Sequence, residues 1–176
     1  MKITLKDGSV LEYNEAKTAG DITKDISMGL FRNATCCKIN GEVKDLRTVI
    51  DADATLEILT FDDEDGKKAF NHTASHIMAQ AVKRLYPEAK LTIGPAIDNG
   101  FYYDFDVEKS FSPDDLAKIE AEMKKIVKED PEIKRFELPV DEAIALMESK
   151  NEPYKIELIK EHAEKGEPIS FYEQGE

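Results

Sequence analysis

Short segments in which apolar and polar residues alternate fill the first 60 residues of the chain. Residues 2–5 and 10–13 predict two strands, joined by a tight turn in which Gly8 provides the positive φ. Apolar residues at helical spacing then predict one helix over residues 18–30. These residues are Ala19, Ile22, Ile26 and Leu30.

Three more strands are predicted after this helix. Residues 36–39 and 42–44 are joined by Asn40-Gly41, a pair typical of type I′ hairpins, and residues 55–59 form another apolar strand. One helix against a small mixed sheet is the β-grasp arrangement, for which about 60 residues suffice only marginally. Such a domain could be an accessory surface for RNA or partners, or a folding and spacer module.

An acidic segment, residues 61–68, separates this domain from the rest, so we predict two domains, 1–61 and 62–176. Negative charge in front of a long helix favours the positive end of its dipole. That helix is expected to end near Pro87. Its apolar residues define a predicted core side: Phe70, Ala74, Ile77, Met78, Ala81 and Leu85.

The remaining pattern predicts an α+β domain. Strands 91–93 and 101–106 flank a turn at Asn99-Gly100, and Ser112 is expected to cap a helix that starts at Pro113. The buried side of that helix is predicted to hold Leu116, Ile119, Met123, Ile126 and Val127. A strand at 133–138, helices at 141–149 and 155–163 and a strand at 169–173 follow.

Composition narrows the possible functions. The net charge is −2 for residues 1–60, with eight Lys/Arg and ten Asp/Glu, and −11 for the remainder, with sixteen and twenty-seven. Nucleic-acid binders usually carry the opposite sign, so strong RNA binding by this chain alone is not expected. No segment approaches the ~20 apolar residues of a membrane span. The only cysteines, Cys36 and Cys37, are adjacent, which favours a reducing, cytoplasmic location.

Two of the three histidines, His72 and His76, are spaced i, i+4 on the predicted long helix. This spacing stacks both imidazoles on one helical face, where they could share a metal, a water or a substrate. A solvated polar face is the plainer interpretation of the same pattern. Thr73 follows the first histidine where zinc metalloproteases need a glutamate, so a protease is excluded.

Later motifs extend this pattern: Ile93-Gly94-Pro95, then Asp98-Asn99-Gly100-Phe101-Tyr102-Tyr103-Asp104, then Tyr154-Lys155. In this order, and along essentially the whole chain, they resemble the amino-terminal half of bacterial threonyl-tRNA synthetases. The resemblance implies an α+β fold with a TGS domain, a ubiquitin-like β-grasp module, over residues 1–61. It also implies an editing domain, shared with alanyl-tRNA synthetases, over residues 62–176. The family's Cys-x-x-x-His element follows shortly after the position of Glu176, so we expect a truncated amino-terminal fragment.

The resemblance also implies a reaction, the hydrolysis of serine wrongly attached to threonine tRNA. Serine lacks one methyl group of threonine, which is worth only about 1–3 kcal/mol of discrimination, so a second, hydrolytic site is needed. In this reaction His72 and His76 would bind and activate water, Lys155 would hold the water or the oxyanion, and Tyr103 would line the pocket. From the residues alone, Lys155 could be a surface lysine and Tyr103 a core aromatic.

Partners and cofactors are likewise implied. We expect tRNA(Thr) with its misacylated 3′ end as partner, no membrane, a homodimeric parent ligase and a monomeric fragment. The parent's ATP-Mg and zinc belong to its catalytic domain, and no cofactor is expected in this chain. His72 and His76 would be zinc ligands only if the absent Cys-x-x-x-His were supplied. The alternative is a non-catalytic RNA- or partner-binding fragment, inactive alone because that half of the site is absent.

Overall fold

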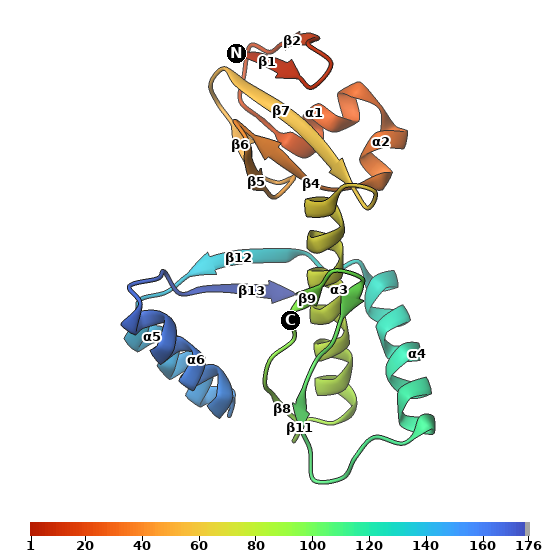
Figure 1. Cartoon of the computed structure of the whole chain (residues 1–176), viewed down its shortest axis with the longest axis vertical. Helices are drawn as coiled ribbons and strands as arrows, with labels where there is room; N and C mark the ends of the chain where they lie inside the picture. Colours follow the sequence, from red (N-terminus) through yellow and green to blue (C-terminus); the bar gives the residue numbers. More distant parts are fainter. Residues whose placement is uncertain (175–176) are drawn as a thin grey trace. The chain divides into compact units, whose positions relative to one another are not determined.

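The computed structural model describes residues 1–174, which form two compact units, residues 1–73 and the residues from Ala74 onward (Figure 1). Both units mix helices and strands, and the predicted α+β class is confirmed. The division falls inside helix α3 (Glu64–Leu85), whereas the boundary expected from the sequence lies before that helix. Within the described residues, no helix is both long enough and apolar enough to cross a membrane.

A five-stranded sheet in the order β2-β1-β7-β4-β5 forms the first unit. Strand β1 runs parallel to β7 and the other neighbours are antiparallel, which is the mixed sheet that the sequence predicted. The strands are β1 (Lys2–Leu5), β2 (Val10–Glu12), β4 (Ala34–Ile39), β5 (Glu42–Lys44) and β7 (Ala54–Thr60); β3 (Lys17–Thr18) pairs separately with β6 (Val49–Ile50).

The turn chemistry of this sheet is as predicted. Asn40 (φ 51°) and Gly41 (φ 84°) both lie in the left-handed region that a type I′ hairpin requires, between β4 and β5. The core of the unit contains buried residues of the sheet and the adjoining helix: Ile3, Ala19, Ile22, Cys37, Ile50 and Leu56.

The single helix predicted over residues 18–30 is in fact two helices, α1 (Ala19–Ile26) and α2 (Met28–Asn33). Ser27 separates them with extended backbone (φ −167°, ψ 129°), and its hydroxyl accepts hydrogen bonds from the amides of Gly29 and Leu30. Apolar spacing continues across this break, so periodicity alone could not reveal it. The local signal was the serine, which is a preferred N-cap residue.

Helix α3 is one continuous helix of 22 residues, as predicted, but its buried side differs from the expected one. Phe70 and Leu85 are exposed (51% and 36%), which contradicts their assignment to the core. Ala81 is buried, and Ile77 and Met78 pack against the core, as predicted. The buried side also carries small and polar residues that were not predicted: Asn71, Ser75, Ala79 and Val82. The apolar pattern favoured large side chains, whereas the close packing of α3 depends on small ones.

The start of α3 is held tightly against the end of β7. The Asp63 carboxylate accepts a hydrogen bond from the Thr60 amide at 2.8 Å. Gly66 lies so close that a Cβ there would be 1.9 Å from the Thr60 carbonyl oxygen. Only glycine fits this contact without a shift of the backbone.

Four very short strands follow α3. Strand β8 (Lys90–Leu91) pairs with β11 (Phe105–Asp106), and β9 (Ala96–Ile97) pairs with β10 (Gly100–Phe101). The predicted strands 91–93 and 101–106 are therefore interrupted between these pairs. Pro95 has no amide proton to donate to a ladder, which accounts for the gap in the first arm. Side chains alternate along this segment: Phe101, Tyr103 and Phe105 are half-buried, and the residues between them are exposed.

Helix α4 (Pro113–Glu129) begins with the predicted cap. Ser112 and Asp115 form a complete capping box, with Pro113 in the first turn. Ile119 and Ile126 are buried, but Leu116 (58% exposed) and Val127 (61%) are not, so the predicted stripe was too wide.

The last elements are α5 (Val140–Ser149), α6 (Pro153–Glu164) and an antiparallel pair, β12 (Ile133–Glu137) with β13 (Ser170–Gln174). All four were predicted to within a few residues. The core beneath them contains Ala143, Met147, Ile159 and Ile169.

Candidate active site

Helix α3 carries both predicted histidines, one turn apart. His72 is exposed and His76 is half-buried. Surrounding protein atoms nevertheless remove part of the water around His72, and this desolvation lowers the pKa of its imidazole. The His76 ring lies edge-on to Tyr172 of β13, with the ring centroids 5.7 Å apart. A histidine with a lowered pKa is neutral at pH 7 and can accept a proton.

The other two predicted residues, Lys155 and Tyr103, are in direct contact. Lys155 lies in the first turn of α6, and its ammonium donates to the Thr92 carbonyl at 2.9 Å and to the Tyr103 hydroxyl at 3.3 Å. The same nitrogen lies 5.6 Å from the centre of the Tyr103 ring. Burial lowers the pKa of Lys155, and Glu152 partly opposes that change. Lys155 is therefore not an ordinary surface lysine.

Tyr103 is held on two sides. Its ring stacks on Phe105 with centroids 4.8 Å apart. On another side it meets the backbone of Gly94, where a Cβ would lie 2.0 Å from a ring carbon. Burial, and then the charge of Glu152, raise the pKa of Tyr103 to about 12, so the hydroxyl stays protonated and can donate a hydrogen bond.

Two residues that the sequence analysis did not select also belong to this network. Glu152 is only 4% exposed, and its carboxylate binds the Lys83 ammonium at 2.8 Å and accepts from the Leu91 amide at 2.9 Å. Lys83 lies in the last turn of α3, the helix that also carries the two histidines. In a chain with 37 acidic residues nothing in the sequence separates a buried glutamate from the exposed ones.

The four predicted residues thus divide into two pairs. His72 and His76 share helix α3, and Lys155 and Tyr103 share a hydrogen bond. A neutral imidazole can act as a base, and the Lys155 ammonium and the Tyr103 hydroxyl are hydrogen-bond donors; ester hydrolysis uses groups of both kinds. Two imidazoles are half of a four-ligand zinc set. Among residues 1–174, no group of three or more His, Cys, Asp or Glu side chains is placed to hold a metal.

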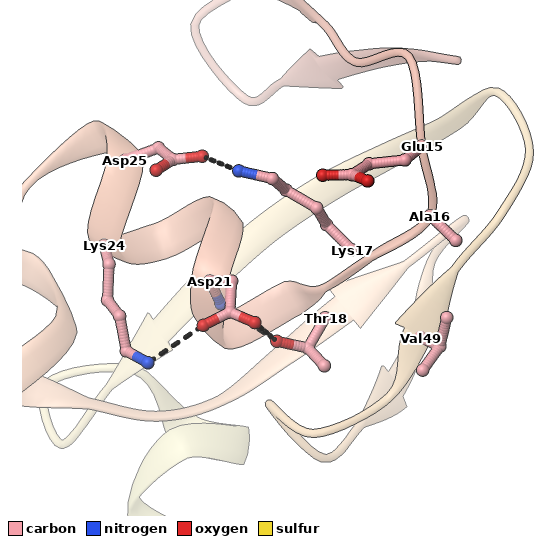
Figure 2. A pocket seen from close by; sticks show the side chains of 8 residues that line it. All are labelled: Glu15, Ala16, Lys17, Thr18, Asp21, Lys24, Asp25 and Val49. Carbon is pink, nitrogen blue, oxygen red and sulfur yellow. Dashed lines mark hydrogen bonds and ion pairs between the residues drawn. The ribbon is translucent and has the colours of Figure 1, made fainter.

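The first unit has an open pocket of its own, of about 520 Å³ (Figure 2). The Lys17 ammonium pairs with Asp25 at 2.8 Å, and Lys24 pairs with Asp21 at 2.9 Å. The charges around this pocket are thus largely matched within it, and we assign no chemistry to it. Its lining is Glu15, Ala16, Lys17, Thr18, Asp21, Lys24, Asp25 and Val49.

The mixed sheet and packed helix of the first unit are those of a TGS domain, and residues 1–60 match that family. The whole chain is similar to proteins named threonine–tRNA ligase. It is 64% identical over 176 residues to the one from Acetivibrio thermocellus, 61% to one from Clostridium perfringens and 60% to that of Clostridium acetobutylicum.

In each case all of this chain is aligned, but it covers only 27–28% of the relative. The resemblance seen in the motifs is confirmed, and the chain spans little more than a quarter of the length of these ligases.

Proposed function

We propose that residues 62–176 form a proofreading domain that hydrolyses seryl-tRNA(Thr) within a longer threonine–tRNA ligase. The observation that carries the proposal is the half-buried Lys155 ammonium, held between the Thr92 carbonyl and the Tyr103 hydroxyl. Burying a cation is costly unless it is well hydrogen-bonded, so such groups are concentrated at functional sites. The similarity to proteins named threonine–tRNA ligase supports an aminoacyl ester of tRNA as the substrate class.

The reaction joins water to the ester. The water oxygen attacks the seryl carbonyl carbon while an imidazole of His72 or His76 takes the water proton. Negative charge develops on the carbonyl oxygen, and the Lys155 ammonium, with the Tyr103 hydroxyl as a second donor, stabilises it. The bond from the carbonyl carbon to the terminal ribose oxygen then breaks, and that oxygen takes the proton. The products are serine and uncharged tRNA(Thr).

The need for this reaction follows from the substrates. A threonine site cannot strongly reject serine, because one missing methyl is worth only about 1–3 kcal/mol. A second site can reverse the preference by admitting serine and excluding the larger side chain. Discrimination then comes from steric exclusion of the extra methyl of threonine, rather than from the small binding energy of that methyl.

A deacylation assay tests the proposal. Seryl-tRNA(Thr) and threonyl-tRNA(Thr) are incubated with the chain, alone and within the longer ligase, and release of each amino acid is followed. We expect release of serine to exceed that of threonine. The double variant His72→Ala/His76→Ala should lose about 10²-fold or more, the usual contribution of a general base.

His162→Ala is the matched control. This histidine lies on α6 and bonds the Glu167 carboxylate, so its loss should leave hydrolysis unchanged. A double variant as active as the unchanged chain would contradict the proposal. Binding of seryl-tRNA(Thr) with no hydrolysis in either form would favour the alternative of a non-catalytic binding module.

A further inference from the structure

Glu152 occupies an unusual position for a glutamate, buried at the point where α6 begins. Its two carboxylate oxygens bind two different elements. Oε1 forms an ion pair with the Lys83 ammonium on α3 at 2.8 Å, and Oε2 accepts from the Leu91 amide of β8 at 2.9 Å. One side chain therefore connects the histidine helix, a strand and the start of the lysine helix.

These contacts lead directly to Lys155. The Lys155 amide donates to the Glu152 carbonyl at 3.2 Å, in the first turn of α6. At the other end of the side chain, the Lys155 ammonium donates to the carbonyl of Thr92, the residue after Leu91. Glu152 thus holds both the backbone that carries Lys155 and the end of β8, next to the carbonyl that accepts from its ammonium.

Lys83 is itself fixed. Besides the carboxylate, its ammonium donates to the carbonyls of Pro87 at 3.0 Å and Ala89 at 2.9 Å. The Lys83 ammonium therefore has two backbone acceptors besides its ion pair with Glu152, and these contacts hold it in place. A buried ion pair of this kind is weak evidence for stability, because apolar residues of similar size would often serve as well. A role in positioning accounts better for its presence.

We propose that Glu152, anchored by Lys83, is a positioning residue that fixes the Lys155 ammonium at the Thr92 carbonyl and the Tyr103 hydroxyl. It acts through Lys155 and need not touch the substrate. The expected effect on hydrolysis rests on the proposed function, whereas the expected effect on the position of the Lys155 ammonium does not.

Electrostatics gives this arrangement a measurable signature. The titratable groups that face Lys155 are Tyr103, from the segment between β10 and β11, and Glu152; Lys83 of α3 faces Glu152. Burial lowers the pKa of Lys155 and the Glu152 charge raises it again. Removal of that charge should lower the Lys155 pKa further, whereas removal of Lys83 should raise it, because Glu152 would then act unopposed.

The experiment is a pH titration of Lys155 by NMR, in chain labelled with ¹³C at lysine. Glu152→Gln keeps the size and an acceptor for the Leu91 amide, and it should shift the Lys155 titration to lower pH. Glu157→Gln is the control, since it removes the same charge from an exposed position on the same helix. It should leave the titration unchanged. A Lys155 titration that does not move in Glu152→Gln would overturn the inference.

Lys83→Gln provides the second, opposite test. It should shift the Lys155 titration to higher pH. Loss of structure would also raise the Lys155 pKa, because it removes the burial that lowers it, so the shift is read only in a variant whose amide NMR spectrum stays that of the folded chain. If Glu152→Gln fails to fold, Lys83→Gln alone tests the inference. A Lys155 titration that does not shift in Lys83→Gln would overturn it.

With seryl-tRNA(Thr), Glu152→Gln should lower kcat on the order of 10- to 100-fold with little change in KM, the effect of a misplaced group. Shifted titrations together with no hydrolysis by any form would uphold the positioning role and refute the proofreading function.

Discussion

The two units of this protein treat polar groups in their interiors differently. In the first unit the buried hydroxyl of Thr23 bonds the Ala19 carbonyl of its own helix at 2.7 Å, a local and inexpensive solution. In the second, the buried carboxylate of Glu152 depends on Lys83 and Leu91, which belong to other elements. Burying an ion is costly and is repaid only by good geometry. Under the proposed function, this difference separates an interior that serves folding alone from one that also positions Lys155.

The strongest way to break this comparison is to remove the charge of Lys155. Lys155→Met keeps the length of the side chain and should lower seryl-tRNA(Thr) hydrolysis about 10²- to 10³-fold, as loss of an oxyanion-stabilising group does. Lys160→Met, at an exposed position of the same helix, is the control. Single-turnover deacylation measures both. Equal loss in the two variants would show that charge on α6, rather than the Lys155 contact, matters.

Two glycines, one in each unit, sharpen the comparison. Gly66→Ala should destabilise the chain by about 3 kcal/mol, because the added Cβ meets the Thr60 backbone, which cannot easily move. Gly94→Ala should cost less, about 1–2 kcal/mol, since the Tyr103 ring can be displaced. Urea unfolding measures the free energies. Hydrolysis should fall with Gly94→Ala but not with Gly66→Ala under conditions where both are folded, and the reverse result would contradict the assignment of the site.

The smallest expected effect is a dependence on alkaline pH. Burial raises the pKa of Tyr103 to about 12 and that of Cys37, in the first unit, also to about 12. A raised pKa in the folded state stabilises the protein below the unfolded-state value, and that stability is lost as pH rises through the folded value. The free energy of unfolding should therefore fall between pH about 9 and about 12.

Tyr103→Phe should reduce the alkaline fall in the free energy of unfolding, and Cys37→Ala should reduce it independently. Tyr102→Phe is the control: it changes an exposed tyrosine and should not reduce the fall. The near-ultraviolet absorbance of phenolate identifies the step that belongs to Tyr103. If that absorbance step occurs with those of the exposed tyrosines, Tyr103 is not held as described.

Much of the fold could be predicted because its signals are local. The Asn40-Gly41 hairpin, the Ser112 cap and the period of α3 all depend on residues close together in sequence. The exposure of Phe70 could not be read from periodicity, since it depends on which side of α3 finds a packing partner. The break at Ser27 also escaped periodicity, but its signal was the capping serine itself. The fold of the second unit was predicted as elements rather than as pairings, and its strands proved shorter.

For the candidate site, the spacing of His72 and His76 was visible in the sequence, but Lys155 and Tyr103 were connected only through the resemblance. Their contact joins residues 52 positions apart. The acceptor for Lys155 is the backbone carbonyl of Thr92, a group that every residue possesses and that no sequence pattern can mark. Glu152 was missed because the residue type alone does not tell whether a glutamate is buried or exposed.

Helix α3 places a constraint on insertions and deletions that differs from any constraint on substitution. Asn71 and Ser75 lie on its packed side and His72 and His76 beside them, each pair one turn apart. An extra residue between the two histidines would rotate everything after it by about 100° around the helix axis, so that the imidazoles no longer lie one above the other. Here the number of residues between the two imidazoles matters as much as their identity, and an insertion tolerated in an exposed loop would not be tolerated in α3.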